Sequence, residues 1–113
     1  MNTYKTGIFA ELVACVYLVM HGFRILQRRY ITGRRTGRAE IDIIARRKNL
    51  LIFVEVKRRG DVITGLNAVT GAQSWRLRRA AETYIAQNHW AGDARFDIVV
   101  VAPHKIRWIR GAI

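Results

Sequence analysis

The sequence contains few of the residues that form covalent cross-links, zinc sites or linkers. Of its 113 residues one is cysteine and one is proline, and no low-complexity tract or serine-rich linker is present. Cys15 has no partner within the chain, so an intramolecular disulfide is excluded and a buried structural thiol is expected. The three histidines are scattered and lack the close spacing of a structural zinc site. These features predict one globular domain, residues 1–113, built around a single core.

The chain also lacks an apolar run long enough to span a bilayer. Its most hydrophobic stretch, residues 8–20, is interrupted by Glu11. It is shorter than the roughly 20 residues that a spanning helix needs. No small-residue cleavage site follows it, as a secretory signal would require. We therefore expect a cytoplasmic protein that does not associate with a membrane.

Acidic residues are scarce as well. Twenty Lys and Arg against eight Asp and Glu give the chain a formal net charge of +12. A surface of this charge attracts polyanions. Nucleic acid is the first expectation, and anionic lipid or an acidic protein are the alternatives.

The order of periodic segments predicts an α/β fold. The apolar stretch at 5–21 predicts a helix whose near-continuous hydrophobicity indicates that most of its faces are covered. Gly22 stands just after its end, where left-handed backbone is common. Segments of alternating or β-branched residues predict strands. The expected order is αβββαββ, with a helix at 5–21, strands at 23–31, 40–45 and 50–57, a loop at 58–69, a helix at 70–89, and strands at 96–101 and 105–110.

Three carboxylates and one lysine stand in two strand segments that are otherwise largely apolar, 40–45 and 50–57. Charges in a buried strand are costly unless something compensates them. Alternation places Glu55 and Lys57 on one face, about 7 Å apart along the strand. On the partner strand Glu40, Asp42 and Ile44 share a face. One hairpin register brings Asp42 beside Glu55, although the sequence alone does not fix that register.

Two adjacent carboxylates in a strongly basic protein favour a divalent cation. Mg²⁺ takes oxygen ligands and keeps several waters, so Asp42, Glu55 and the main-chain carbonyl of Val56 could hold one. Lys57 would then lie beside a metal-bound water, which suits hydrolysis of a phosphodiester. The alternative is a salt-bridge cluster on the open face of a hairpin. Glu11 has two interpretations too, a metal ligand and a carboxylate stabilised near the N-terminal end of its helix.

Basic residues near these acids are candidates for phosphate contacts. They concentrate in the loop at 32–38 and at the start of the second helix, and the alternative for each is a solvated surface. Trp75 either stacks on a base or covers the core, and Asp97 is assigned a structural role beside an arginine. The expected nucleic-acid contacts are Arg34, Arg35, Arg38, Arg58, Gln73, Arg76 and Arg79.

Taken together, these motifs resemble the YraN-like family of small bacterial proteins, in the PD-(D/E)XK nuclease superfamily, whose fold is similar to that of archaeal Holliday junction resolvases. The sequence departs from the family pattern at Ala10 and Ala39, where glycine is usual, and at Gln73, where lysine is usual. The resemblance covers nearly the whole chain and rests on Gly7 with Glu11, Gly22, Glu40-Ile41-Asp42, Phe53-Val54-Glu55-Val56-Lys57 and Arg95-Phe96-Asp97.

The resemblance implies a restriction-endonuclease-like fold, a mixed central sheet flanked by helices. It implies that Asp42, Glu55 and Lys57 are the catalytic triad. Glu11 would be a further catalytic acid at the same metal, with Glu40 as a supporting residue behind the ligands. In the related nucleases the acids bind one or two Mg²⁺ or Mn²⁺ ions, the lysine assists the attacking water, and homodimers act on branched DNA. The expected function is a metal-dependent endonuclease.

Two functions of other classes remain open. The first is a non-catalytic nucleic-acid-binding module on a nuclease scaffold, which the lost charge at Gln73 would favour. The second is a small ribosome-associated or assembly protein whose basic surface supplies only electrostatic attraction. Phosphate contacts position a protein without reading a sequence, so these residues do not determine the substrate's shape or whether it is DNA or RNA.

Overall fold

The computed structural model describes residues 3–33, 35, 37–59 and 71–112, with the side chains of these residues apart from 3–6, 72 and 73. Most of the loop predicted at 58–69 lies outside these ranges. Within them, the elements follow the expected αβββαββ order. They are α1 (Thr3–Met20), β1 (Arg24–Thr32), β2 (Ala39–Arg47), β3 (Leu50–Arg58), α3 (Gly71–Gln87), β4 (Asp93–Ala102) and β5 (Lys105–Ile109).

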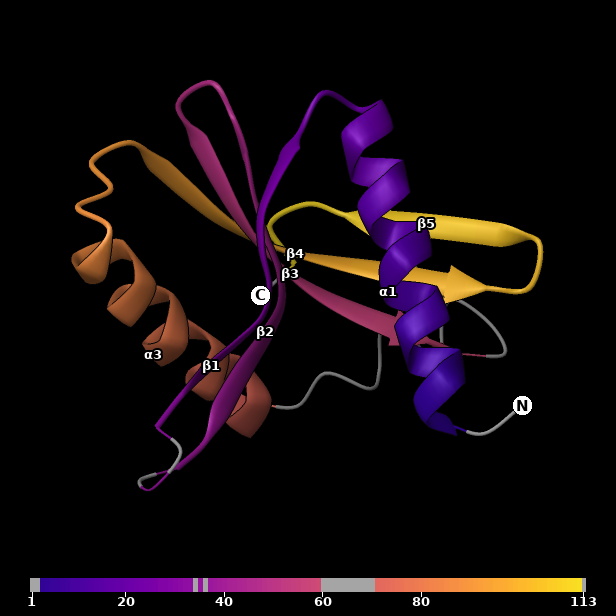
Figure 1. Cartoon of the computed structure of the whole chain (residues 1–113), viewed down its shortest axis with the longest axis horizontal. Helices are drawn as coiled ribbons and strands as arrows, with labels where there is room; N and C mark the ends of the chain where they lie inside the picture. The colour runs from indigo at the N-terminus through magenta and orange to yellow at the C-terminus, as the bar shows by residue number, and fades with distance from the viewer. Residues whose placement is uncertain (1–2, 34, 36, 60–70, 113) are drawn as a thin grey trace.

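The strands in the described part of the chain form one mixed sheet in the order β1-β2-β3-β4-β5. The β3–β4 pair is parallel and the other three pairs are antiparallel. Helix α1 packs on one face of this sheet and α3 on the other (Figure 1). The predicted α/β class, with a mixed central sheet flanked by helices, is therefore confirmed.

The core is divided between the two faces of the sheet, as alternation along β3 predicts. Leu51 and Phe53 face α3, whereas Ile52 and Val54 face α1. Three- and four-residue spacing in the second helix predicts an inner face of Gln73, Leu77, Ala80, Ala81, Tyr84 and Ile85, and it is confirmed where its side chains are described. It consists of Leu77, Ala80, Ala81 and Tyr84, with Ile85 partly buried beside them.

Helix α1 buries only one of its faces. Ala14, Cys15 and Leu18 are buried against the sheet, and burial raises the pKa of the Cys15 thiol. The prediction that most faces of this helix are covered is wrong, because large apolar side chains on its outer face remain exposed. Hydrophobicity alone does not say how many neighbours a helix has. No helix in the described ranges is long and apolar enough to cross a membrane.

Strand β2 takes part in two pairs that separate at its middle. Its pairing with β3 extends from Arg47↔Leu50 to Ile43↔Val54, whereas its pairing with β1 continues to Thr32↔Ala39. In Figure 1 the lower ends of β1 and β2 run to one side while β3 and β4 run to the other. We call the opening between β2 and β3, bounded by Asp42, Glu55 and Val56, the fork.

Side-chain alternation along β2 breaks at the fork. Ile41 and Ile44 are three residues apart, yet both belong to the core cluster on the α3 side. The prediction that Glu40, Asp42 and Ile44 share one face is therefore wrong. The break occurs where the pairing of β2 with β3 ends, so beyond this point only β1 holds β2 in the sheet.

Candidate active site

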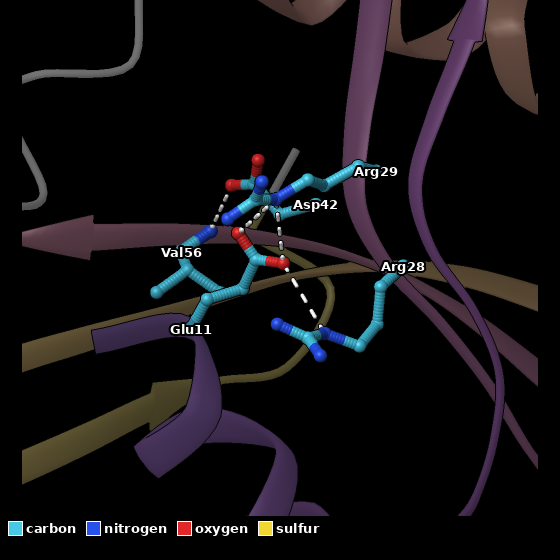
Figure 2. A network of polar contacts seen from close by, with 5 residues as sticks. All are labelled: Glu11, Arg28, Arg29, Asp42 and Val56. Carbon is cyan, nitrogen blue, oxygen red and sulfur yellow. Dashed lines mark hydrogen bonds and ion pairs between the residues drawn. The ribbon is translucent and has the colours of Figure 1, made fainter. Parts of the chain in front are cut away.

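Asp42 lies at the fork, where its carboxylate takes the place of a strand contact. The backbone N–H of Val56 donates to Asp42 Oδ2 at 2.8 Å (Figure 2). Because β2 has separated from β3, the side chain satisfies a donor that the β2 backbone no longer reaches. In a strand the N–H and C=O of one residue point to the same side, so the Val56 carbonyl is also directed into the fork.

Glu55 and Lys57 point to the same side of β3, as alternation predicts. Lys57 Nζ lies 2.9 Å from Glu55 Oε1, and Glu55 itself is buried. Asp42 and Glu55 line one cavity of about 310 Å³. Arg38, which immediately precedes β2, and Arg76 on α3 line it as well. The hairpin register that brings Asp42 beside Glu55 is the one that the structure adopts.

Asp42 is in an environment that opposes its ionisation. Burial is the larger cause and the charge of Glu55 the next, and together they raise the pKa of Asp42 to about 8. The hydrogen bond from Val56 acts in the opposite direction but does not offset them. A cation bound at the fork would favour the ionised carboxylate, because it would offset the repulsion between the two acids.

Glu11 reaches the other side of Asp42 from helix α1. The two carboxylates line a second cavity, of about 470 Å³, together with Val56. Glu11 is buried and accepts from Arg29 Nε, which lies 3.3 Å from each of its carboxylate oxygens. Arg28 Nε lies 3.4 Å from Glu11 Oε1 (Figure 2). Glu11 thus lies near Asp42, as a further acid at the same site would, and its contacts with Arg28 and Arg29 were not predicted.

The arginine pair depends on an unusual backbone conformation in β1. Consecutive strand residues normally point to opposite faces, so Arg28 and Arg29 should not reach one carboxylate. Arg29 has φ 54°, a left-handed conformation that is uncommon for residues other than glycine. Such conformations cost free energy and cluster at functional sites. The one feature of the sequence that could have indicated this contact is the pair of adjacent arginines within a predicted strand.

The donors at the fork fit a hard divalent cation in part. Within the described ranges, no three histidine, cysteine or acidic side chains gather closely enough to hold a metal ion. Two carboxylates, Asp42 and Glu55, with the Val56 carbonyl, suit Mg²⁺ or Mn²⁺, which complete their shells with water. Glu11 is held by arginines in the adjoining cavity, so its role as a metal ligand stays a prediction. Glu40 is exposed and borders both cavities.

Most of the predicted phosphate-binding arginines that the structure describes surround these cavities. Arg38 borders both, Arg58 borders the one with Glu11, and Arg76 borders the one with Glu55. Arg76 also lines a third cavity with Arg79. Arg35 is exposed and borders none of the three. Arg34 and the side chain of Gln73 lie outside the described residues.

Two further predictions concern residues away from the fork. Trp75 does not cover the core, since it is 62% exposed and has the Arg79 guanidinium 5.7 Å from its ring centroid. Asp97 is buried, and its carboxylate accepts two hydrogen bonds from Arg95 at 2.8 and 2.9 Å. It accepts two more at 2.9 Å, from Trp108 Nε1 and from the Gly111 N–H. The predicted structural environment of Asp97 beside an arginine is confirmed.

Comparison with known proteins places this site in a family. The model of the "Uncharacterised protein family UPF0102" matches residues 10–101. A UPF0102 protein of Bradyrhizobium diazoefficiens is 43% identical over 105 residues, which cover 91% of this chain and 76% of that protein. A UPF0102 protein of Nitrobacter winogradskyi is 40% identical over 112 residues, covering 96% of this chain and 92% of that protein. The chain belongs to the UPF0102 family, the YraN-like family that its motifs resemble.

Proposed function

We propose that the protein is a metal-dependent nuclease that hydrolyses phosphodiester bonds, with DNA as the favoured polymer. The observation that carries this proposal is the pair of carboxylates at the fork. Asp42 and Glu55 share one cavity, and the Lys57 ammonium contacts Glu55 at 2.9 Å. A structural ion pair would not require a second acid whose ionisation is opposed by its surroundings.

The side chains at the fork would have two roles, to bind a cation and to stabilise the reacting phosphate and water. Asp42, Glu55 and the Val56 carbonyl would bind Mg²⁺ or Mn²⁺ through oxygen. The bound cation would lower the pKa of a coordinated water and stabilise charge on the phosphate. Lys57, held in place by Glu55, would orient that water or stabilise the developing charge.

The arginines around the fork would position the backbone of the nucleic acid. Arg38, Arg58 and Arg76 border the cavities that contain the acids. Their charges face phosphates whether the substrate is duplex or branched, so they explain affinity and not sequence preference. Branched DNA is the substrate shape that the resemblance to junction resolvases favours.

The test is cleavage of labelled four-way junction, flap, linear duplex and single-stranded DNA in Mg²⁺, Mn²⁺ or EDTA. We expect cleavage that requires metal and that falls by about 10²–10³-fold or more in Glu55→Gln and in Lys57→Ala. Matched controls are Glu82→Gln on α3 and Lys105→Ala on β5, both exposed residues away from the fork. Activity that survives in Glu55→Gln, or that is lost equally in the controls, would contradict the proposal.

A second candidate is a nucleic-acid-binding module without catalysis. The observation that favours it is Glu11, whose carboxylate is engaged by Arg28 and Arg29 and not free to complete a set of three acids. On this alternative no DNA or RNA substrate is cut in any metal, while binding persists with a steep salt dependence. Binding to Glu55→Gln would then equal binding to the wild-type chain.

A further inference from the structure

The outer face of α1 carries a row of exposed apolar side chains that the proposed nuclease activity does not use. Each has 45–76% of its surface exposed, which is unusual for such large apolar residues on one element. We call this row the α1 stripe. It consists of Phe9, Leu12, Val16, Val19 and Met20.

The spacing of the α1 stripe is that of a helix which packs against another helix. Phe9, Leu12, Val16 and Val19 are separated by three, four and three residues. This is the heptad seam by which two helices interlock. Beside the seam, a cavity of about 370 Å³ between α1 and β5 is lined by every stripe residue except Val19, together with Val13, Tyr17 and Ile106. That volume can take a large apolar side chain from a facing helix.

The charge distribution identifies the partner. From residue 7 to residue 20 the one charged residue is Glu11, which is buried on the opposite side of the helix. The whole chain carries a net charge of +12, so two copies repel each other over most approaches. The α1 stripe is a surface on which they can meet without opposing like charges.

A membrane surface fits the α1 stripe less well than a second copy does. Helices that lie on anionic lipid carry lysine and arginine along the polar side of their apolar face. Residues 7–20 of α1 contain neither. The size of the stripe also suits a dimer, because it exposes on the order of 500 Å², more than half of what one partner contributes to a standard interface.

We propose that the chain forms a two-fold symmetric dimer in which the α1 stripes of two copies pack against each other. A self-complementary patch is what such symmetry requires. Glu11 points to the opposite side of the helix, so the fork stays open in the dimer. The proposal therefore stands whether or not the fork is catalytic.

The first experiment is sedimentation velocity over a hundred-fold range of protein concentration. We expect the wild-type chain to reach twice its mass of 13.0 kDa, and Leu12→Glu and Val16→Glu to stay at the single-chain mass throughout. The matched control is Leu26→Glu on β1, since Leu26 is 40% exposed where Leu12 is 45% exposed. It should dimerise as the wild type does. A monomeric wild type, or a control that dissociates equally, overturns the proposal.

Cross-linking decides the matter if a glutamate variant fails to fold. In a Cys15→Ser background, Val16→Cys places one thiol near the middle of the stripe, where a two-fold axis through the centre of the stripe brings it close to its mate. We expect oxidation to give a covalent dimer for Val16→Cys and none for Leu26→Cys. If the wild type is instead monomeric but binds phosphatidylglycerol vesicles through the stripe, with binding lost in Val16→Glu, the face belongs to lipid and the dimer is wrong.

Discussion

Two aspartates of the sheet, Asp97 and Asp42, have surroundings that act on their carboxylates in opposite directions. Asp97 on β4 is fully buried, yet its two oxygens accept four hydrogen bonds, two of them from Arg95. Asp42 on β2 accepts one from Val56, lies beside Glu55, and has its pKa raised to about 8 by burial and then by that acid. The first arrangement stabilises a fold and the second makes a carboxylate available to a ligand.

The partner of each aspartate explains the difference. The hydrogen bond from Arg95 to Asp97 raises the pKa of the guanidinium, so the ion pair is mutually stabilising. The charge next to Asp42 has the same sign as its own. A protein retains a repulsive pair of buried acids where a cation or a proton binds them. Replacing each aspartate by the isosteric asparagine tests this contrast directly.

The largest effect is expected from Asp97→Asn. The asparagine amide would place an NH₂ group against donors that now face the fully buried carboxylate, and would leave the half-buried Arg95 without its counter-charge. Breaking a buried ion pair from one side costs about 3–5 kcal/mol in unfolding free energy. Urea denaturation would measure the loss. A loss below about 1 kcal/mol, the value typical of an exposed pair, would mean that Asp97 does not stabilise the fold as we argue.

The effect expected for Asp42→Asn has the opposite sign. Asparagine keeps an acceptor for the Val56 N–H and removes the acid whose ionisation burial and Glu55 oppose. In EDTA we expect this variant to be more stable than wild type by about 1 kcal/mol, or roughly 4–8 °C in melting temperature for a domain of this size. Differential scanning calorimetry would measure it. If Asp42→Asn melts below wild type in EDTA, Asp42 is a structural acid like Asp97.

The pH dependence of stability sharpens the comparison. Because the pKa of Asp42 is raised from 3.8 to about 8 on folding, the folded chain binds more protons than the unfolded chain between these values. In EDTA, stability should therefore fall as pH rises through that window. The difference in melting temperature between wild type and Asp42→Asn isolates this contribution from the histidines. It should widen from pH 5 to pH 8, and a constant difference would contradict the raised pKa.

Sequence patterns predicted the order of the elements and the β2–β3 hairpin, because hydrophobic alternation and a short polar turn indicate a hairpin locally. They offered the pairing of Asp42 with Glu55 only as one register among those possible, since the turn's exact geometry sets the register. The fork was not foreseen. It depends on β2 ending its pairing with β3 before Asp42 while its pairing with β1 continues, and no local pattern records where one of two neighbours separates. The contact of Arg28 and Arg29 with one acid was missed for the same reason, since it depends on the left-handed backbone of Arg29. Nor could an apolar run tell which face of α1 the sheet would cover.

The smallest effect is expected from replacing single arginines near the two acids. Arg76 borders the cavity that contains Asp42, whereas Arg107 is exposed on β5, close to Trp108, which contacts Asp97. Each is an exposed side chain with one positive charge, so replacing either by alanine changes the net charge equally. If nucleic acid binds over the fork, Arg76→Ala removes one phosphate contact and Arg107→Ala removes none.

Binding of an unrelated set of DNA duplexes to Ca²⁺-loaded protein, measured by fluorescence anisotropy at several salt concentrations, distinguishes the two arginines. We expect Arg76→Ala to lower the slope of log K against log salt by about one and to weaken all sequences alike. Arg107→Ala should leave the slope unchanged. Because long-range attraction by net charge would affect both variants equally, equal slopes would mean that DNA does not lie over the fork.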